Sequence, residues 1–553
     1  MTWTLNLPLR RGRLAAAPAR AAAPAPAAPR PASLPPPAPS PGGAAAEPRL
    51  RDWIGVLAMV VGQFMAIMDV QIVTSSLTQI QGGLSASADE IAWVQTAYLI
   101  ADVVMVPMSG TLSRMLSTRI VFVIATLGFT VASGLCATAT TLSQMILYRA
   151  MQGFCGGAIG PAVFPVVYTK FHGRQLASIM VFISLILNLS STLGPTIGGF
   201  LTDTFSWHWL FLVNIAPGIG VVIVVWLTID IDRPELSMLR NFDVIGMVLM
   251  AIFLGCLEYV LEEGPRWDWF ADDTIFAAGI ASAIASVFFF WRVLSFHQPI
   301  VELRTFVNRN FSLGAFYTFV IGTGLYGATY LIPLFLAQVR GFNALQIGET
   351  VVVTGLAQMV MSPFTARIAR AIDLRLMLAI GMALFAVAIY LTAGLTNQAG
   401  FWELAFPQAL RGFALMFCYL PANMISLGAL PQDKLKSGAS LYNLTRDLGG
   451  AIVLATIGTI MNNRLHFHWN RLIEDINPAR PVVQQFLDAQ TNRFATLNPG
   501  DPHQAAVTLL GRLVEREALV LTFNDAILLL GSMFVVGLVL MPLVRRQRSQ
   551  MAR

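Results

Sequence analysis

The sequence predicts an all-helical integral membrane protein, and three observations carry this prediction. Apolar residue types make up 56% of the 553 residues and charged types only 12%, against about 25% charged residues in soluble domains. The mean hydropathy is +0.65. Long apolar segments also follow one another from residue 53 onward. Such a composition excludes a cytosolic enzyme, a nucleic-acid-binding protein and a disordered protein.

The chain begins with a segment of a different kind. Residues 1–50 are rich in Ala, Pro and Arg and hold 12 of the 30 prolines, a composition that cannot bury enough apolar surface to fold. We interpret this segment as a disordered cytoplasmic tail; an over-extended gene start is the alternative. Seven arginines in the first 51 residues and four in the last nine exceed the net charge of +6. The excess of positive charge therefore lies at the two ends of the chain, and it does not indicate a nucleic-acid partner.

Fourteen apolar segments are expected to span the membrane. Each has about 20 residues or slightly more, which suffices to cross a hydrocarbon core of about 30 Å. They must be helices, because lipid offers no hydrogen-bond partner to the backbone. The segments are 53–76, 91–112, 119–139, 143–166, 176–201, 209–229, 242–261, 274–295, 311–337, 345–368, 375–396, 403–429, 438–462 and 520–544.

The distribution of basic residues supports this count. If the N-terminus is cytoplasmic, the inner loops hold fourteen Lys and Arg and the short outer loops hold two, Arg266 and Arg340. Basic residues concentrate on the cytoplasmic side of membrane proteins, so both termini, including the tail 545–553, are predicted to be cytoplasmic. The remaining connection, 463–519, is predicted to be a long periplasmic loop. The fourteen basic residues expected in inner loops are Arg114, Arg119, Lys170, Arg174, Arg233, Arg240, Arg292, Arg304, Arg309, Arg367, Arg370, Arg375, Lys434 and Lys436.

Charged residues within these spans are functional candidates, because burying a charge in a bilayer is costly. At a rise of about 1.5 Å per residue, Asp69 lies roughly 10 Å and Arg149 roughly 9 Å below the outer surface, so the two can compensate each other. Asp102 lies roughly 17 Å deep, near the midplane. Two alternatives remain: a static ion pair, or carboxylates that gain and lose protons. Further embedded charges are Glu258, Arg411, Arg446 and Asp447.

Several motifs resemble those of one transporter family. Gly194, Pro195, Gly198 and Gly199 in the fifth span resemble the antiporter motif of drug:proton exporters in the major facilitator superfamily. Arg149, Gln152, Gly153, Gly156 and Gly157 resemble the motif of the fourth span, and Phe64 to Asp69 that of the first. Stretches at 207–214, 241–246, 261–269 and 437–450 resemble the fourteen-helix EmrB/QacA branch. The resemblance covers about residues 53–545.

The resemblance implies a fold and a function. The fold would be two six-helix bundles, 53–229 and 311–544, with two inserted helices at 242–295. The function would be export of hydrophobic or amphipathic toxic compounds across the inner membrane, driven by the proton gradient without a cofactor. Asp69, Asp102 and Arg149 would couple proton and substrate. By analogy with exporters of double-membraned bacteria, the 463–519 loop would face a periplasmic adaptor that joins an outer-membrane channel; a solvated connector is the alternative.

Substrate contacts are predicted at polar or amphipathic residues within the spans, because a drug cavity is mainly apolar with a few polar groups. The candidates are Gln71, Tyr98, Asn188, Tyr326, Tyr330, Gln358 and Asn423.

One departure from the superfamily pattern concerns the connection after the second span. Its usual aspartate is Arg114 here and its second glycine is Ser117. The gating contact that this aspartate makes in the superfamily is therefore not expected.

Other functions fit the sequence less well. Export of one dedicated compound, such as a siderophore, organic acid or antibiotic, uses the same fold and stays open. A receptor or scaffold would need a folded soluble domain, which the sequence does not show, and an enzyme would need a polar catalytic cluster. The only residues spaced like metal ligands are His466 and His468, and we predict no metal site.

Overall fold

The structure is a computed structural model that describes residues 49–87, 90–235, 237–238, 242–296, 298–474, 476–477, 479–495 and 501–544. Of the predicted tails, 1–50 and 545–553, only residues 49 and 50 are described. A few side chains within helices also lie outside the description, among them Asn188.

The described chain is helical, which confirms the predicted fold class. Thirteen helical segments of the described chain are long and apolar enough to cross a membrane. Each overlaps one predicted span. The fourteenth predicted span, 176–201, lies within the helix α6 (Gly173–Thr204).

The first bundle is built from the N-terminal helices. The helix α1 packs against α6 and α8, and α3 packs against α5 and α4. The predicted span 209–229 is interrupted at Val213 and Asn214, which separates α7 from α8. The helices are α1 (Leu50–Ser75), α2 (Leu77–Leu84), α3 (Trp93–Leu116), α4 (Thr118–Ala137), α5 (Leu142–Lys170), α6, α7 (Trp209–Leu212) and α8 (Ile215–Thr228).

The second bundle follows two inserted helices, α9 (Val244–Glu263) and α10 (Asp273–Ser295). These two pack against each other, and α9 also contacts α3 and α15, so it bridges the two bundles along one side. The helices of the second bundle are α11 (Arg309–Gln338), α12 (Ala344–Ala371), α13 (Leu374–Thr392), α14 (Phe401–Ser426), α15 (Leu435–Glu474) and α17 (Pro502–Val539), with α16 (Pro481–Ala495) between the last two.

Side-chain caps begin several of these helices where the sequence places a short polar residue. The side chains of Thr141, Asn308 and Asp501 accept hydrogen bonds from the first-turn amides of α5, α11 and α17. Such caps satisfy amide groups that have no partner within the helix.

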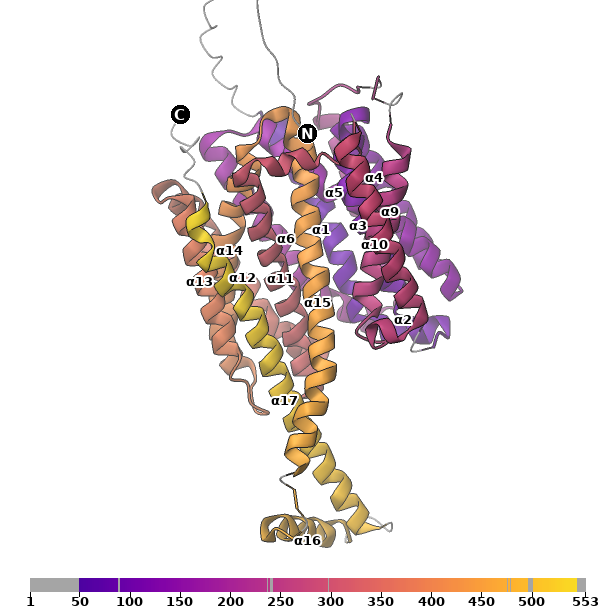
Figure 1. Cartoon of the computed structure of the whole chain (residues 1–553), viewed down its shortest axis with the longest axis vertical. Coiled ribbons are helices and arrows are strands. Elements are labelled where there is room, and N and C mark those ends of the chain that lie inside the picture. Colours follow the sequence, from indigo (N-terminus) through magenta and orange to yellow (C-terminus); the bar gives the residue numbers. More distant parts are fainter. Residues whose placement is uncertain are drawn as a thin grey trace, which may run out of the picture. The chain divides into compact units, whose positions relative to one another are not determined.

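Both described ends of the chain lie at one end of the helices, which we call the terminal end (Figure 1). Arg51, at the start of α1, donates to the carbonyl of Leu227 at the end of α8. Arg309 donates to the carbonyl of Leu543 near the last described residue. We call the opposite end the distal end.

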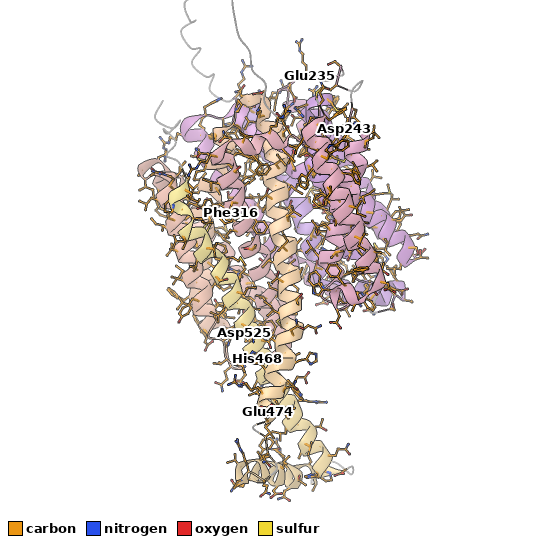
Figure 2. The ribbon with its side chains drawn as sticks, viewed as in Figure 1. Glu235, Asp243, Phe316, His468, Glu474 and Asp525 are labelled. Carbon is orange, nitrogen blue, oxygen red and sulfur yellow. The ribbon has the colours of Figure 1, made fainter. Side chains whose placement is uncertain are left out.

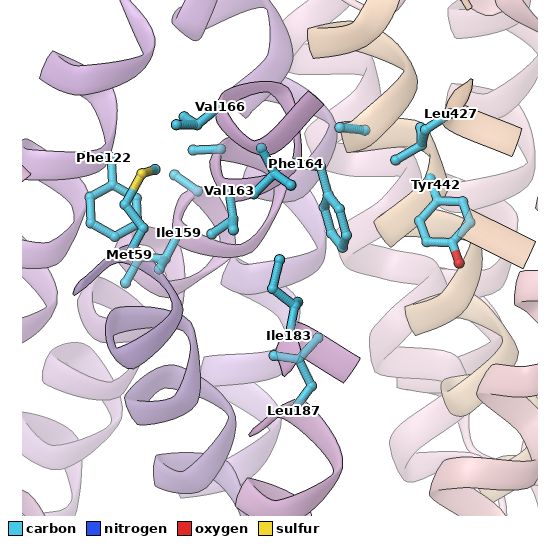
Figure 3. Close-up of a cluster of buried hydrophobic side chains, with 14 of the residues drawn as sticks. Met59, Phe122, Ile159, Val163, Phe164, Val166, Ile183, Leu187, Leu427 and Tyr442 are labelled. Carbon is cyan, nitrogen blue, oxygen red and sulfur yellow. The ribbon is translucent and has the colours of Figure 1, made fainter. Parts of the chain in front are cut away.

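The two bundles meet at the terminal end through a shared apolar cluster (Figure 3). The rings of Phe164 on α5 and Tyr442 on α15 approach edge to face with centroids 6.1 Å apart. Tyr168 on α5 donates to the carbonyl of Asn423 on α14 at 3.1 Å. Apolar side chains of both bundles therefore close the space between them at this end.

The predicted periplasmic connection 463–519 is largely helical in the structure. The helix α15 continues to Glu474, α17 begins at Pro502, and α16 lies across their far end (Figure 1). The hydropathy of a segment indicates where lipid contact stops, whereas a helix continues as long as its backbone bonds are favourable. Polar contacts join the extended parts: Asp525 on α17 lies 2.9 Å from His468 Nε2 and 3.3 Å from Arg464 Nε on α15 (Figure 2).

Candidate functional site

A buried ion pair lies inside the first bundle. The Nη1 of Arg149 on α5 is 2.6 Å from Oδ2 of Asp69 on α1, and both side chains are 0% exposed. The depth estimate from the sequence placed these two charges at one level, and the structure brings them into direct contact. A carboxylate and a guanidinium buried together neutralise each other, which the protein interior requires.

Further donors surround the carboxylate. The amides of Gln152 on α5 and Asn214, next to α8, donate to Asp69 Oδ1 at 2.9 and 2.8 Å. Arg149 also donates to Gln152 Oε1 at 2.7 Å. Both amide residues lie in motifs that carried the family resemblance, but sequence reasoning gave them no role, since only the tertiary structure places Asn214 beside Asp69.

Arg149 links this pair to α3. Its Nε donates to the carbonyl of Val94 at 3.1 Å, and its guanidinium lies 4.3 Å from the ring centre of Tyr98. Tyr98 precedes Asp102 by four residues, and such residues share one face of a helix. Arg149 and Asp102 have no direct contact in the described structure, so α3 is the physical connection between them.

Glycines of the fourth-span motif make this close packing possible. A Cβ on Gly153 would overlap the backbone oxygen of Tyr98, and one on Gly157 would lie 2.5 Å from that of Asp102. No real side chain tolerates such distances, so α5 can approach α3 this closely only with glycine at these positions.

A second group of charges lies between the bundles. Arg446 and Asp447 on α15 are 3.0 Å apart and keep 10% and 19% of their side chains exposed. The hydroxyl of Tyr326 on α11 donates to Asp447 at 3.3 Å. Asp102 is half-buried, and Glu258 on α9 is buried. The inserted helix α9 packs on α3 and α15, so it adds a carboxylate to this interior region.

The predicted substrate residues do not form one group. Tyr98 is buried against Arg149, Asn423 is buried at the terminal closure, and Gln358 is buried within the second bundle. Tyr326 contacts Asp447 and Tyr330 is 43% exposed.

The remaining candidates lie along α1 and α6. A Cβ on Gly194 would overlap the side chain of Gln71, so the antiporter motif packs its helix on α1 two residues beyond Asp69. Pro195 lies inside α6, Gly198 is buried and Gly199 is half-buried.

The connection that departs from the superfamily pattern has its own set of contacts. Arg114 lies 3.5 Å from Glu302. The carboxylate of Asp232, after α8, accepts from the hydroxyl of Ser117 at 2.9 Å and from the amide and hydroxyl of Thr118. Lys436 of the second bundle also pairs with Asp232. An acid from another connection therefore joins the two bundles here, which the local sequence did not indicate.

A cavity of about 740 Å³ lies beside these contacts and is lined by Arg114, Asp232, Glu302 and Lys436 among others. None of the predicted substrate residues lines it.

Comparison with known proteins identifies relatives over most of the chain. Residues 59–454 match the Major Facilitator Superfamily. The colistin resistance protein EmrB of Acinetobacter baumannii is 37% identical over 489 residues, which cover 88% of this chain and 95% of that protein. The multidrug export protein EmrB of Escherichia coli strain K12 is 27% identical over 485 residues, or 87% and 93% of the two chains. The solved structure of the proton:xylose symporter XylE has a TM-score of 0.57 at 11% identity, covering 89% and 95%, and supports the fold alone.

Proposed function

The chain belongs to the Major Facilitator Superfamily and to its EmrB-type exporters, and from this premise we propose that it exports hydrophobic or amphipathic toxic compounds in exchange for protons. The observation that carries the mechanism is the ion pair of Asp69 and Arg149, which lies fully buried in a membrane-spanning bundle. Charges at such positions are costly and occur where a transporter moves ions or protons.

The proposed orientation follows from the basic residues. Those expected in inner loops, such as Lys170, Arg292 and Arg375, lie at or near helix ends at the terminal end. Because basic residues favour the cytoplasmic side, the terminal end faces the cytoplasm and α16 faces the periplasm. A reporter fused after residue 500 should then be outside and one fused after 550 inside; the same side for both would contradict this orientation.

We further propose that Asp102 carries the proton. It is half-buried between the bundles, whereas Asp69 has its carboxylate occupied by Arg149, Gln152 and Asn214. Asp69 and Arg149 respond to substrate through the contacts of Arg149 with α3. The proton gradient drives the exchange, so the cycle needs no cofactor. Alternating access would come from rocking of the two bundles around the interior region.

Membrane vesicles test this function directly. Inverted vesicles with an imposed pH gradient should accumulate several chemically unrelated hydrophobic compounds, and Asp102→Asn should abolish accumulation. Uptake of a single compound from a broad panel would favour the dedicated exporter. Gradient-independent uptake would contradict proton coupling.

A partner for the distal extension is a separate proposal. The helix α16 has no buried residue. Because all of its side chains are accessible, we propose that it contacts a periplasmic adaptor. Deleting Pro481–Ala495 should then reduce resistance in cells while uptake into inverted vesicles stays intact. If resistance and uptake both survive the deletion, α16 is a solvated connector.

A further inference from the structure

The second bundle holds a buried arginine of a different kind from Arg149. Arg411 on α14 is 4% exposed, and its Nη2 donates to the hydroxyl of Thr354 on α12 at 3.1 Å. Its Nε and Nη1 are buried with no hydrogen-bond partner among the described residues. Arginine stays protonated in proteins. A full positive charge therefore lies here, and its one hydrogen bond is to a neutral hydroxyl group.

Comparison of the two bundles makes the difference clear. Arg149 is on the fourth long helix of the first bundle and Arg411 on the fourth of the second. Arg149 has Asp69 as its counter-ion, with three further contacts around its guanidinium. Within the described chain, no carboxylate lies within ion-pair distance of Arg411. A buried charge without a partner is strongly unfavourable, so this bundle needs a counter-ion from elsewhere.

Further buried amide groups without partners lie near Arg411, and no carboxylate is among them. Gln358 on α12 is 0% exposed, and neither its amide nitrogen nor its oxygen has a partner in the described structure. Gln408, one turn before Arg411, uses its oxygen to accept from Thr354 at 3.0 Å, which leaves its Nε2 unpartnered among the described groups. Four donor nitrogens on these three residues are therefore unpartnered among the described groups: Nε and Nη1 of Arg411 and the amide nitrogens of Gln358 and Gln408. The amide oxygen of Gln358 is the one unpartnered acceptor among them.

A small cavity lies beside Arg411 and Gln358. Its volume is about 10 Å³ and it is lined by Gly324, Leu325, Thr329, Thr354, Gln358, Arg411 and Leu415. A volume of about 10–15 Å³ holds one water-sized group. The lining leucines make the remainder apolar, so a larger anionic head does not fit unless α11, α12 and α14 separate.

We propose that Arg411 and Gln358 form a site for one monovalent anionic group, filled by a halide ion in this closed arrangement or by the carboxylate of an amphipathic substrate when α11, α12 and α14 separate. The inference rests on the proposed export function and assigns a site in the second bundle to anionic groups. Arg411 supplies the charge and Gln358 a neutral donor from the facing helix.

Binding to the purified full-length protein in a non-ionic detergent, without a pH gradient, tests the proposal. Decanoate is compared with decanol and decyltrimethylammonium by tryptophan fluorescence titration, and thermal unfolding is compared in sodium chloride and sodium gluconate. Wild type should bind decanoate about tenfold or more tightly than decanol, since a hydrogen bond to a charged group contributes about 1.5–3 kcal/mol. Arg411→Gln should abolish this preference. Arg309→Gln, which removes an arginine at the terminal end, should retain it.

Each outcome decides one point. A decanoate preference that requires Arg411 supports the substrate carboxylate. Chloride-dependent stability that requires Arg411, without a decanoate preference, assigns the site to a halide. If Arg411→Gln does not fold, Gln358→Leu keeps the charge and should still weaken anion binding several-fold. The proposal fails if no anion response differs between wild type and these two variants, and it can fail this way while gradient-driven export persists.

Discussion

Replacing Arg149 by methionine should destabilise the protein by about 3–5 kcal/mol, which is the cost of leaving one partner of a buried pair uncompensated. The structure supports the upper part of this range. Both partners are 0% exposed, so water cannot replace the lost guanidinium at Asp69. The variant also loses the bonds of Arg149 to Gln152 and to the carbonyl of Val94. Unfolding in mixed micelles with increasing dodecyl sulfate, followed by tryptophan fluorescence, measures the change.

Two further variants make this measurement specific. Arg149→Lys keeps the charge and loses the planar guanidinium, so its stability should lie between those of the wild type and Arg149→Met. Arg446→Met breaks the pair with Asp447, which keeps 10% and 19% exposure. That pair keeps some exposure whereas Arg149 and Asp69 have none, so breaking it should cost less stability than Arg149→Met does. If Arg149→Met loses no more stability than Arg446→Met, the reasoning from burial is refuted.

The other predictions concern coupling and the terminal closure. Asp69→Asn and Asp102→Asn should each abolish gradient-driven export while drug binding persists; proton release on drug binding by the double variant would place the coupling carboxylate elsewhere. A double-mutant cycle of Asp232→Asn and Lys436→Met should give a coupling of about 1 kcal/mol at pH 7, since both side chains keep contact with water. Burial alone raises the pKa of the Asp232 carboxyl, but its bonds to Lys436 and neighbouring groups hold the pKa below the ordinary 3.8. The coupling should therefore be constant above about pH 4 and disappear as the pH falls below the lowered pKa. A coupling that rises on acidification would contradict this assignment.

Hydropathy was sufficient for the membrane spans because the physical requirement is local. Each span must present about 20 apolar residues to lipid, and each predicted segment, such as 345–368, overlaps a helix of the structure. The approach of Asp69 and Arg149 could also be anticipated, since depth follows from counting residues along each helix. Counting gives no rotation about the helix axis, however. Tyr98 and Asn423 were therefore predicted to contact substrate, whereas in this structure Tyr98 packs on Arg149 and Asn423 lies at the terminal closure.

The features that were missed depend on contacts between distant segments. The helical extension of α15 ends in polar residues, so no hydropathy criterion separates it from a loop. The pairing of Lys436 with Asp232 joins residues about 200 positions apart. The lack of a counter-ion at Arg411 is a property of its whole surroundings, since a charged residue in a span does not reveal whether another helix brings its partner.

The contacts of Asp232 explain how the terminal end can both close and open. Three donor groups of Ser117 and Thr118, which belong to the same bundle, bind Asp232, and these bonds persist if the bundles separate. Only the bond from Lys436 crosses between the bundles. The lysine side chain is 19% exposed, so opening transfers its charge to water and leaves the acid with its own donors. The pair of Lys436 and Asp232 therefore costs about 1 kcal/mol to break, and the apolar contacts around Phe164 and Tyr442 must separate as well when this end opens.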